Sequence, residues 1–200
     1  MAWNWTADSK LCFVTTGATA PFTELIESVL SPTCLDSLRE GGFTHLLVQY
    51  GSAEDVYKQF SKLASAYIQE TTPSKGDLVI DGIDFNPDGL KTQFQLVQRS
   101  KGLVISHAGS GSILEALRYQ IPLIVVPNTG LLDNHQEELA VAMERNNYLV
   151  RGDVKNLAPA IKKSDEFRLK MSQFPPMTSG KHRETKSFAA IMDETTGYMD

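Results

Sequence analysis

Residues 102–140 read GLVISHAGSGSILEALRYQIPLIVVPNTGLLDNHQEELA and decide the fold of this 200-residue chain. The uncharged run at Leu103–Ile105 is typical of a strand buried on both faces. The Gly109–Gly111 segment then permits a tight turn and leaves bare backbone for a ligand to approach. A helix is expected from Ser112 to about Tyr119, and a second buried strand is expected at Leu123–Val126.

A polar loop and another helix complete this half of the fold. Asp133 or Asn134 can cap a helix that ends near Asn147. The order strand, glycine turn, helix, strand, polar loop, helix indicates half of a doubly wound α/β sheet. Ligands of such sheets bind beyond the carboxyl ends of the strands. We therefore expect His107–Ser112 and Asn128–Gln136 to lie side by side at that edge.

The rest of the chain supplies the remaining elements of a Rossmann-like parallel sheet with helices on both faces. We expect one nucleotide-sugar-binding domain at residues 1–175, then a linker and C-terminal helix at 176–200 that docks on a partner. Further strands are expected at 11–16, 43–50, 78–80 with 83–85, and 148–150 as an edge strand. Further helices are expected at 22–30, 32–40, 56–67, 90–100 and 156–163, with a turn-rich loop at 71–76.

Composition excludes several classes of protein. The chain is 42% hydrophobic, which is enough for a proper core without metal or disulfide support. A net charge of −5 argues against a nucleic-acid binder and against a patch for anionic membranes. No signal segment or run of about 20 apolar residues is present. Cys12 and Cys34 are expected to be unpaired, with Cys12 inert in a buried strand, so a soluble protein of a reducing compartment is indicated.

The first loop, at residues 16–19, has two possible interpretations. A glycine at position 17, followed by a helix, offers backbone N–H groups to a phosphate. An ordinary strand-to-helix turn would have the same pattern. The dinucleotide fingerprint G-x-G-x-x-G is absent, because Gly17 is the only glycine in the loop.

Three polar positions after the Leu103 strand also allow more than one role. Ser112-x-x-Glu115 matches a capping box, yet the Glu115 carboxylate would also suit the two hydroxyls of a ribose. His107 can be a core histidine, a catalytic base or a ligand contact. Ser110 and Ser112 are interpreted as phosphate donors at a helix N-terminus rather than as nucleophiles.

The cluster Asp133-Asn134-His135-Gln136 holds more polar groups than one helix cap requires. Neutral donors and acceptors of this kind select patterns of sugar hydroxyls or amides. The histidines are scattered and H-E-x-x-H is absent, so no metal set is predicted. The residues alone therefore predict a site for a phosphorylated, hydroxyl-rich ligand.

At this point the motifs resemble a known family. HAGSGSILEAL (107–117), IPLIVVPN (121–128) and LDNHQEELA (132–140) look like the nucleotide-sugar half of GT-B glycosyltransferases. With VTTGATAPF (14–22) and FTHLLVQYG (43–51), they closely resemble the catalytic subunits of the eukaryotic two-subunit UDP-N-acetylglucosamine transferase of dolichol-linked oligosaccharide synthesis. The resemblance covers about residues 11–151.

This resemblance implies an inverting hexosyltransferase that uses UDP-N-acetylglucosamine, with no cofactor and no metal. It implies that Glu115 holds the ribose, that His135 and Gln136 read the sugar, and that Asn134 contacts the donor or caps the helix. The expected diphosphate and uracil contacts are Thr16, Gly17, Thr19, Gly109, Ser110, Gly111 and Ser112 for the diphosphate, and Phe85 for uracil.

A GT-B enzyme needs two such halves, roughly 300 residues or more, and this chain holds one. The resemblance implies that a membrane-anchored subunit carries the acceptor side and recruits this cytoplasmic chain to the cytosolic face of the endoplasmic reticulum. The acceptor would be dolichol-diphosphate-N-acetylglucosamine. The general base is either His107 or a group on the partner. Two other interpretations stay open: a nucleotide-sugar epimerase-like half, and a regulatory nucleotide-binding module without chemistry.

Overall fold

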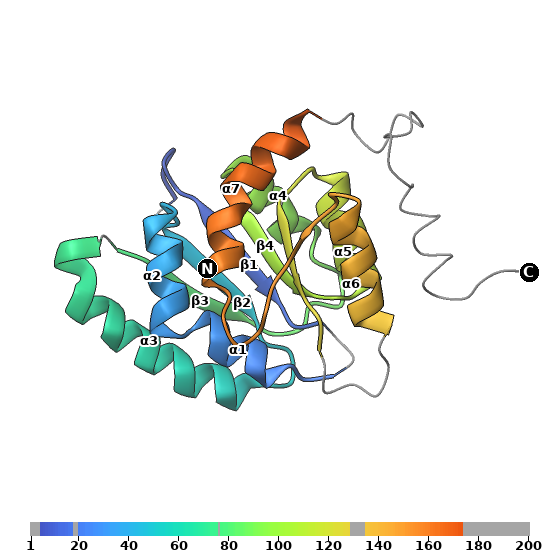
Figure 1. The fold of residues 1–200 in the computed structure, drawn as a ribbon. Coiled ribbons are helices and arrows are strands. Elements are labelled where there is room, and N and C mark those ends of the chain that lie inside the picture. Colours follow the sequence, from blue (N-terminus) through green and yellow to red (C-terminus); the bar gives the residue numbers. More distant parts are fainter. Residues whose placement is uncertain (1–4, 18–19, 76, 129–134, 174–200) are drawn as a thin grey trace, which may run out of the picture.

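Six parallel strands run through the middle of the molecule in the order β3-β2-β1-β4-β5-β6 (Figure 1). The computed structural model describes residues 5–17, 20–75, 77–128 and 135–173, with the backbone alone at 72–75 and 135–136. The strands are β1 (Leu11–Thr15), β2 (His45–Gln49), β3 (Val79–Ile83), β4 (Leu103–His107), β5 (Leu123–Val126) and β6 (Val150–Arg151).

Helices cover both faces of this sheet, as Figure 1 shows. On one face, the core cluster contains buried residues of α1 (Thr23–Val29), α2 (Pro32–Glu40), α3 (Glu54–Lys75) and α7 (Ala158–Ser172). On the other face, it contains residues of α4 (Lys91–Arg99), α5 (Ser110–Arg118) and α6 (His135–Arg145). The predicted Rossmann-like parallel sheet with helices on both faces is confirmed.

Side chains of the central strands alternate between the two cores, as strand geometry requires. In β1, Cys12 and Val14 face the α1–α2–α3–α7 side, and Leu11 and Phe13 face the α4–α5–α6 side. Neither face of β1 is exposed to solvent, so its sequence LCFVT is apolar almost throughout.

Both cysteines are free, as expected, and both are buried, which was predicted for Cys12 alone. Burial raises the pKa of the Cys34 thiol to about 12. Burial also raises the pKa of Cys12, with a further contribution from Cys34 that Lys10 partly opposes. Because the thiolate is the reactive form, these thiols are inert packing groups in the folded chain.

Two helices are longer than the sequence pattern predicted. The loop expected at 71–76 is wrong for residues 71–75, because α3 continues to Lys75. The Thr71 hydroxyl donates to the Tyr67 carbonyl one turn earlier at 2.8 Å, and the helix continues through the segment whose composition favours a turn. The helix expected at 156–163 becomes α7, because Phe167 and Met171 continue its buried stripe.

The remaining differences lie at element ends. The predicted edge strand is confirmed as β6, with Val150 as its first residue. Helix α5 begins at Ser110, two residues earlier than expected. The predicted domain boundary at 175–176 and the C-terminal helix lie outside the described residues. None of the helices in the described ranges is both long and apolar enough to cross a membrane.

The strand order fixes where a ligand can enter. The chain reverses its direction of travel across the sheet between β1 and β4, which is the topological switch point of a doubly wound sheet. These strands pair with Thr15 opposite Ser106. The loops that follow them therefore leave the sheet side by side.

Candidate functional site

Two glycine-bearing bends meet at the switch point. One follows β1 at Gly17, and the other follows β4 at Gly109. The imidazole of His107 lies against both glycines: a Cβ on Gly17 would be 2.6 Å from His107 Cε1, and a Cβ on Gly109 would be 2.8 Å from the same atom. The structure therefore brings together two segments that are about ninety residues apart in sequence.

The Gly17 bend is anchored from below by buried polar groups. The Thr16 hydroxyl donates to the Gln49 carbonyl at 3.1 Å, and the Thr16 backbone N–H points to the same oxygen at 3.4 Å. The Thr15 hydroxyl donates to the Gln49 side chain. Thr16 is 3% exposed and holds the bend in place, and the half-buried Gly17 follows it.

A third loop, after β2, adjoins the same bend. Gly51 has a positive φ of 53°, and a Cβ there would be 3.5 Å from the Gly17 carbonyl oxygen. Sequence reasoning did not select Gln49 or Gly51 as site residues. Their position at the end of a predicted buried strand (Gln49) and directly after it (Gly51) was the available signal, because it places them at the carboxyl edge.

The first turn of α5 is open to a ligand. Gly109 is the N-cap residue, and it has no side chain with which to cap the helix. The first backbone N–H groups of a helix have no partner within it. Ser110 and Gly111 are exposed, and a Cβ on Gly111 would meet nothing within 4 Å. This turn offers amide hydrogens and the positive end of a helix dipole to an anion.

The capping-box interpretation of Ser112 and Glu115 is wrong. Ser112 lies inside the first turn of α5, and the cap position belongs to Gly109. The helix begins earlier because Gly109 adopts extended backbone angles and Gly111 joins the helix. Glu115 instead pairs with Arg118 at 2.9 Å, with 33% of the Glu115 side chain exposed. Its carboxylate therefore stays accessible, one turn along from the open amides.

Other predicted donor contacts fall at different distances from this centre. Phe85 is 50% exposed and follows β3, an edge strand separated from β4 by β2 and β1. His135 and Gln136 are the first two residues of α6, which follows β5 at the same edge of the sheet, and their side chains are outside the described part. Thr19 and Asn134 also lie outside the described residues.

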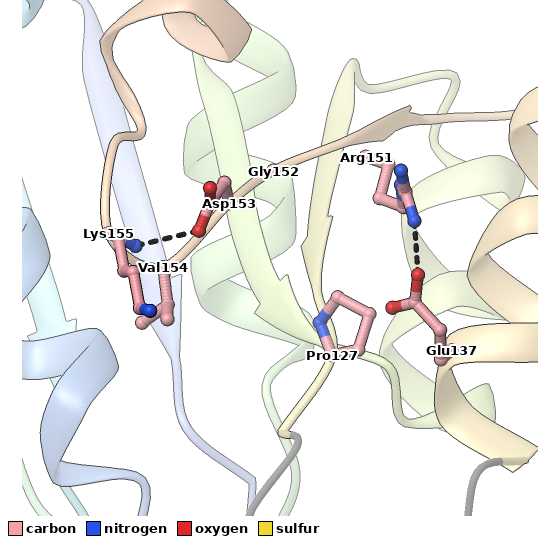
Figure 2. A pocket seen from close by; sticks show the side chains of 7 residues that line it. All are labelled: Pro127, Glu137, Arg151, Gly152, Asp153, Val154 and Lys155. Atoms are coloured by element: carbon pink, nitrogen blue, oxygen red, sulfur yellow. Dashed lines mark hydrogen bonds and ion pairs between the residues drawn. The ribbon is translucent and has the colours of Figure 1, made fainter.

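A pocket of about 440 Å³ lies beyond the ends of β5 and β6 (Figure 2). Figure 2 shows Arg151 and Glu137 paired on one side of Pro127, and Asp153 with Lys155 on the other. Gly152 fits closely between them, since a Cβ there would be 2.8 Å from Ile124. The two cationic and two acidic side chains balance, so the pocket suits a neutral polar group better than an ion.

His107 is poorly placed to act as a base. Burial lowers the pKa of His107, and the Thr15 backbone partly opposes this shift. His107 Nδ1 is buried without a well-formed hydrogen bond, and Nε2 is turned toward Gly109. Nδ1 is therefore shielded, and Nε2 lies against the Gly109 bend. In the described ranges, no group of three or more side chains is arranged to hold a metal ion.

The chain shows similarity to glycosyltransferase sequences over most of its length. The family model described as the glycosyltransferase family 28 C-terminal domain matches residues 11–194. The chain is 37% identical over 177 residues to the UDP-N-acetylglucosamine transferase subunit ALG13 of Eremothecium gossypii, covering 84% of this chain and 86% of that protein. It is 35% identical over 153 residues to the protein of the same name from Saccharomyces cerevisiae, covering 66% and 72%.

Solved structures show the same fold. The solution structure of ALG13 superposes with a TM-score of 0.57 and 31% identity, covering 79% of this chain and 86% of that one. The crystal structure of Acinetobacter baumannii MurG superposes with a TM-score of 0.53 and 16% identity. It covers 96% of this chain and 51% of MurG, so the present fold corresponds to half of a GT-B protein.

The buried imidazole predicts a pH dependence of stability. A folded-state pKa below the unfolded value of about 6.5 makes a stabilising contribution that is complete above that value. The contribution is lost as the pH falls through about 6.5 toward the folded pKa, because the unfolded chain then binds more protons. In His107→Gln, the free energy of unfolding from urea titrations should therefore change less between about pH 7.5 and 5.5.

His45, whose pKa is also lowered by burial, provides the comparison. His45→Gln should remove the contribution of His45 to the pH dependence of the free energy of unfolding and leave the contribution of His107. If the free energy of unfolding of His107→Gln changed with pH as much as that of the unsubstituted chain, the lowered pKa of His107 would be contradicted.

Proposed function

Since this chain belongs to the family of glycosyltransferase family 28 C-terminal domains, we propose that it binds UDP-N-acetylglucosamine as a glycosyl donor. The observation that carries the proposal is the open first turn of α5 beside the Gly17 bend. Within the described residues, nothing in the protein fills the space over Gly111. The names of the ALG13 relatives supply the identity of the donor.

The donor is placed by the chemistry of its parts. The diphosphate lies over the amides of Ser110–Ser112 and faces Gly17, where a helix dipole and bare backbone favour negative charge. The ribose diol reaches the Glu115 carboxylate along the same helix, and its two hydroxyls donate to the two oxygens. His135 and Gln136 contact the sugar, and Phe85 flanks the uracil.

The transfer step follows from this placement. An acceptor hydroxyl oxygen forms a bond to the anomeric carbon while the bond from that carbon to the diphosphate oxygen breaks, with inversion. The electron pair leaves on UDP, whose growing charge the α5 amides stabilise more strongly than in the ground state. The acceptor proton passes to a general base. Because His107 Nδ1 is buried and its Nε2 lies against the Gly109 bend, we place that base on the partner subunit.

A partner is required by this proposal. The relatives are named as subunits of a transferase, and the fold corresponds to half of a GT-B protein. We propose that a membrane-anchored subunit binds dolichol-diphosphate-N-acetylglucosamine and holds this chain at the cytosolic face of the endoplasmic reticulum. Residues 176–200 are proposed as the docking tail. The pocket beyond the ends of β5 and β6 lies at the same edge of the sheet as the donor site.

The direct test combines this chain with the membrane subunit, labelled UDP-N-acetylglucosamine and the lipid-linked acceptor. We expect transfer of one N-acetylglucosamine only when both subunits are present. Isothermal titration with UDP-N-acetylglucosamine and with NAD separates this function from a regulatory module. Binding of NAD without binding of the sugar nucleotide would exclude the transferase.

Substitution of Glu115 tests the ribose contact. Glu115→Gln should reduce transfer about a hundredfold or more, because each hydrogen bond to a charged group contributes about 1.5–3 kcal/mol. The fold should persist, since the exposed pair with Arg118 contributes at most about 1 kcal/mol. Arg118→Ala is the control, because it breaks the same ion pair and leaves the carboxylate. If Glu115→Gln and Arg118→Ala lost transfer activity to the same extent, a contact between Glu115 and the ribose would be contradicted.

Gly111 tests the open turn. Alanine is about 1 kcal/mol more favourable than glycine inside a helix, so Gly111→Ala should stabilise the chain slightly. The added methyl group enters the space assigned to the diphosphate, so affinity for UDP-N-acetylglucosamine should fall. Leu114→Ala, at a position that is 42% exposed on the same helix, is the control for binding. Unchanged affinity in Gly111→Ala would place the diphosphate elsewhere.

A further inference from the structure

His107 occupies the space between the two bends. Its ring atoms Cε1 and Nε2 would be 2.6 and 2.7 Å from a Cβ on Gly17. A Cβ on Gly109 would clash with Nε2 and would be 2.8 and 3.1 Å from Cε1 and Cδ2. Any side chain at either glycine would thus have to displace the imidazole, because real Cβ atoms do not approach other heavy atoms so closely.

The two glycines are required for different reasons. Gly17 has a φ of +86°, which disfavours any other residue whatever the space around it. Gly109 has φ −78° and ψ 126°, ordinary extended angles that any residue adopts. At Gly109, therefore, the obstacle to a side chain is steric, and the three heavy atoms nearest a Cβ there all belong to the His107 imidazole.

The backbone of His107 is held firmly enough to give its ring a fixed place. Its carbonyl oxygen accepts hydrogen bonds from the Ser106 hydroxyl and from the Gly109 N–H, both at 2.8 Å. Its Cα pairs with that of Val126 in β5. The ring projects from this anchored backbone and is half-buried between the bends.

We propose that His107 is a positioning residue whose ring sets the spacing of the two bends, so that both address the same anionic group. This inference rests on the proposed donor site, and it assigns His107 no proton transfer. A ring of fixed size between two backbones keeps the Gly17 bend and the first turn of α5 at one separation. An error of about 1 Å in such a spacing can cost on the order of a hundredfold in rate.

Paired substitutions in the full 200-residue chain test the spacer, with UDP as the probe. Gly109→Ala should weaken UDP binding about tenfold or more and lower the unfolding midpoint, because its methyl group displaces the ring. Adding His107→Ala should restore much of the unfolding midpoint, since the methyl group then has room, but UDP binding should stay weak because the ring that spaces the bends is gone. His107→Ala should not rescue Gly17→Ala, whose backbone angle remains unfavourable.

Three results would overturn the spacer. The first is independent, additive effects of Gly109→Ala and His107→Ala on the unfolding midpoint, measured without ligand. The second is equal rescue of Gly17→Ala, which would indicate general loosening. The third is loss of one limb of the pH profile of kcat in His107→Ala with UDP affinity unchanged, which would make His107 a base. Failure of the unsubstituted chain to bind UDP would instead reject the proposed donor site, and the unfolding measurement would still decide the spacer.

Discussion

The pairing of β1 with β4 is the constraint on which the site depends. These strands are neighbours in space although β2, β3 and four helices separate them in sequence, and their register sets Thr15 opposite Ser106. Parallel hydrogen bonding fixes this alignment, and apolar side chains on both faces prevent it from slipping. The two bends, and the imidazole ring between them, follow from this pairing, because the segments after β1 and β4 leave the sheet at the same edge.

The strand positions could be predicted because buried parallel strands have a strong sequence signal. Runs such as Leu103–Ile105 and Leu123–Val126 carry no charge and end at turn-forming residues. Helix ends were harder to place. Ser112 matched a cap, but Gly109 took that position because its extended angles suit an N-cap and a glycine can enter the helix behind it. Local chemistry allowed both starts, so the sequence pattern alone could not choose between them.

The site was predictable in its residue types and less so in its contacts. Gly17, Gly109 and Glu115 were selected from turn chemistry and from a family resemblance, and the fold places the two glycines against one imidazole. That three-way contact joins residues far apart in sequence, so spacing alone could not reveal it. Thr16 was expected to contact the phosphates. Its N–H and hydroxyl instead donate to the Gln49 carbonyl and hold the Gly17 bend in place.

The two buried thiols make the opening of this sheet measurable. Cys12 is 0% exposed in β1, and Cys34 is 2% exposed in α2 of the same core. A thiol reagent can react only after the helices and strands around the thiol open locally, so the rate of alkylation measures how often this core opens. Since the first bend extends directly from β1, slower alkylation in the presence of a ligand would register how tightly that ligand locks the two halves of the sheet together.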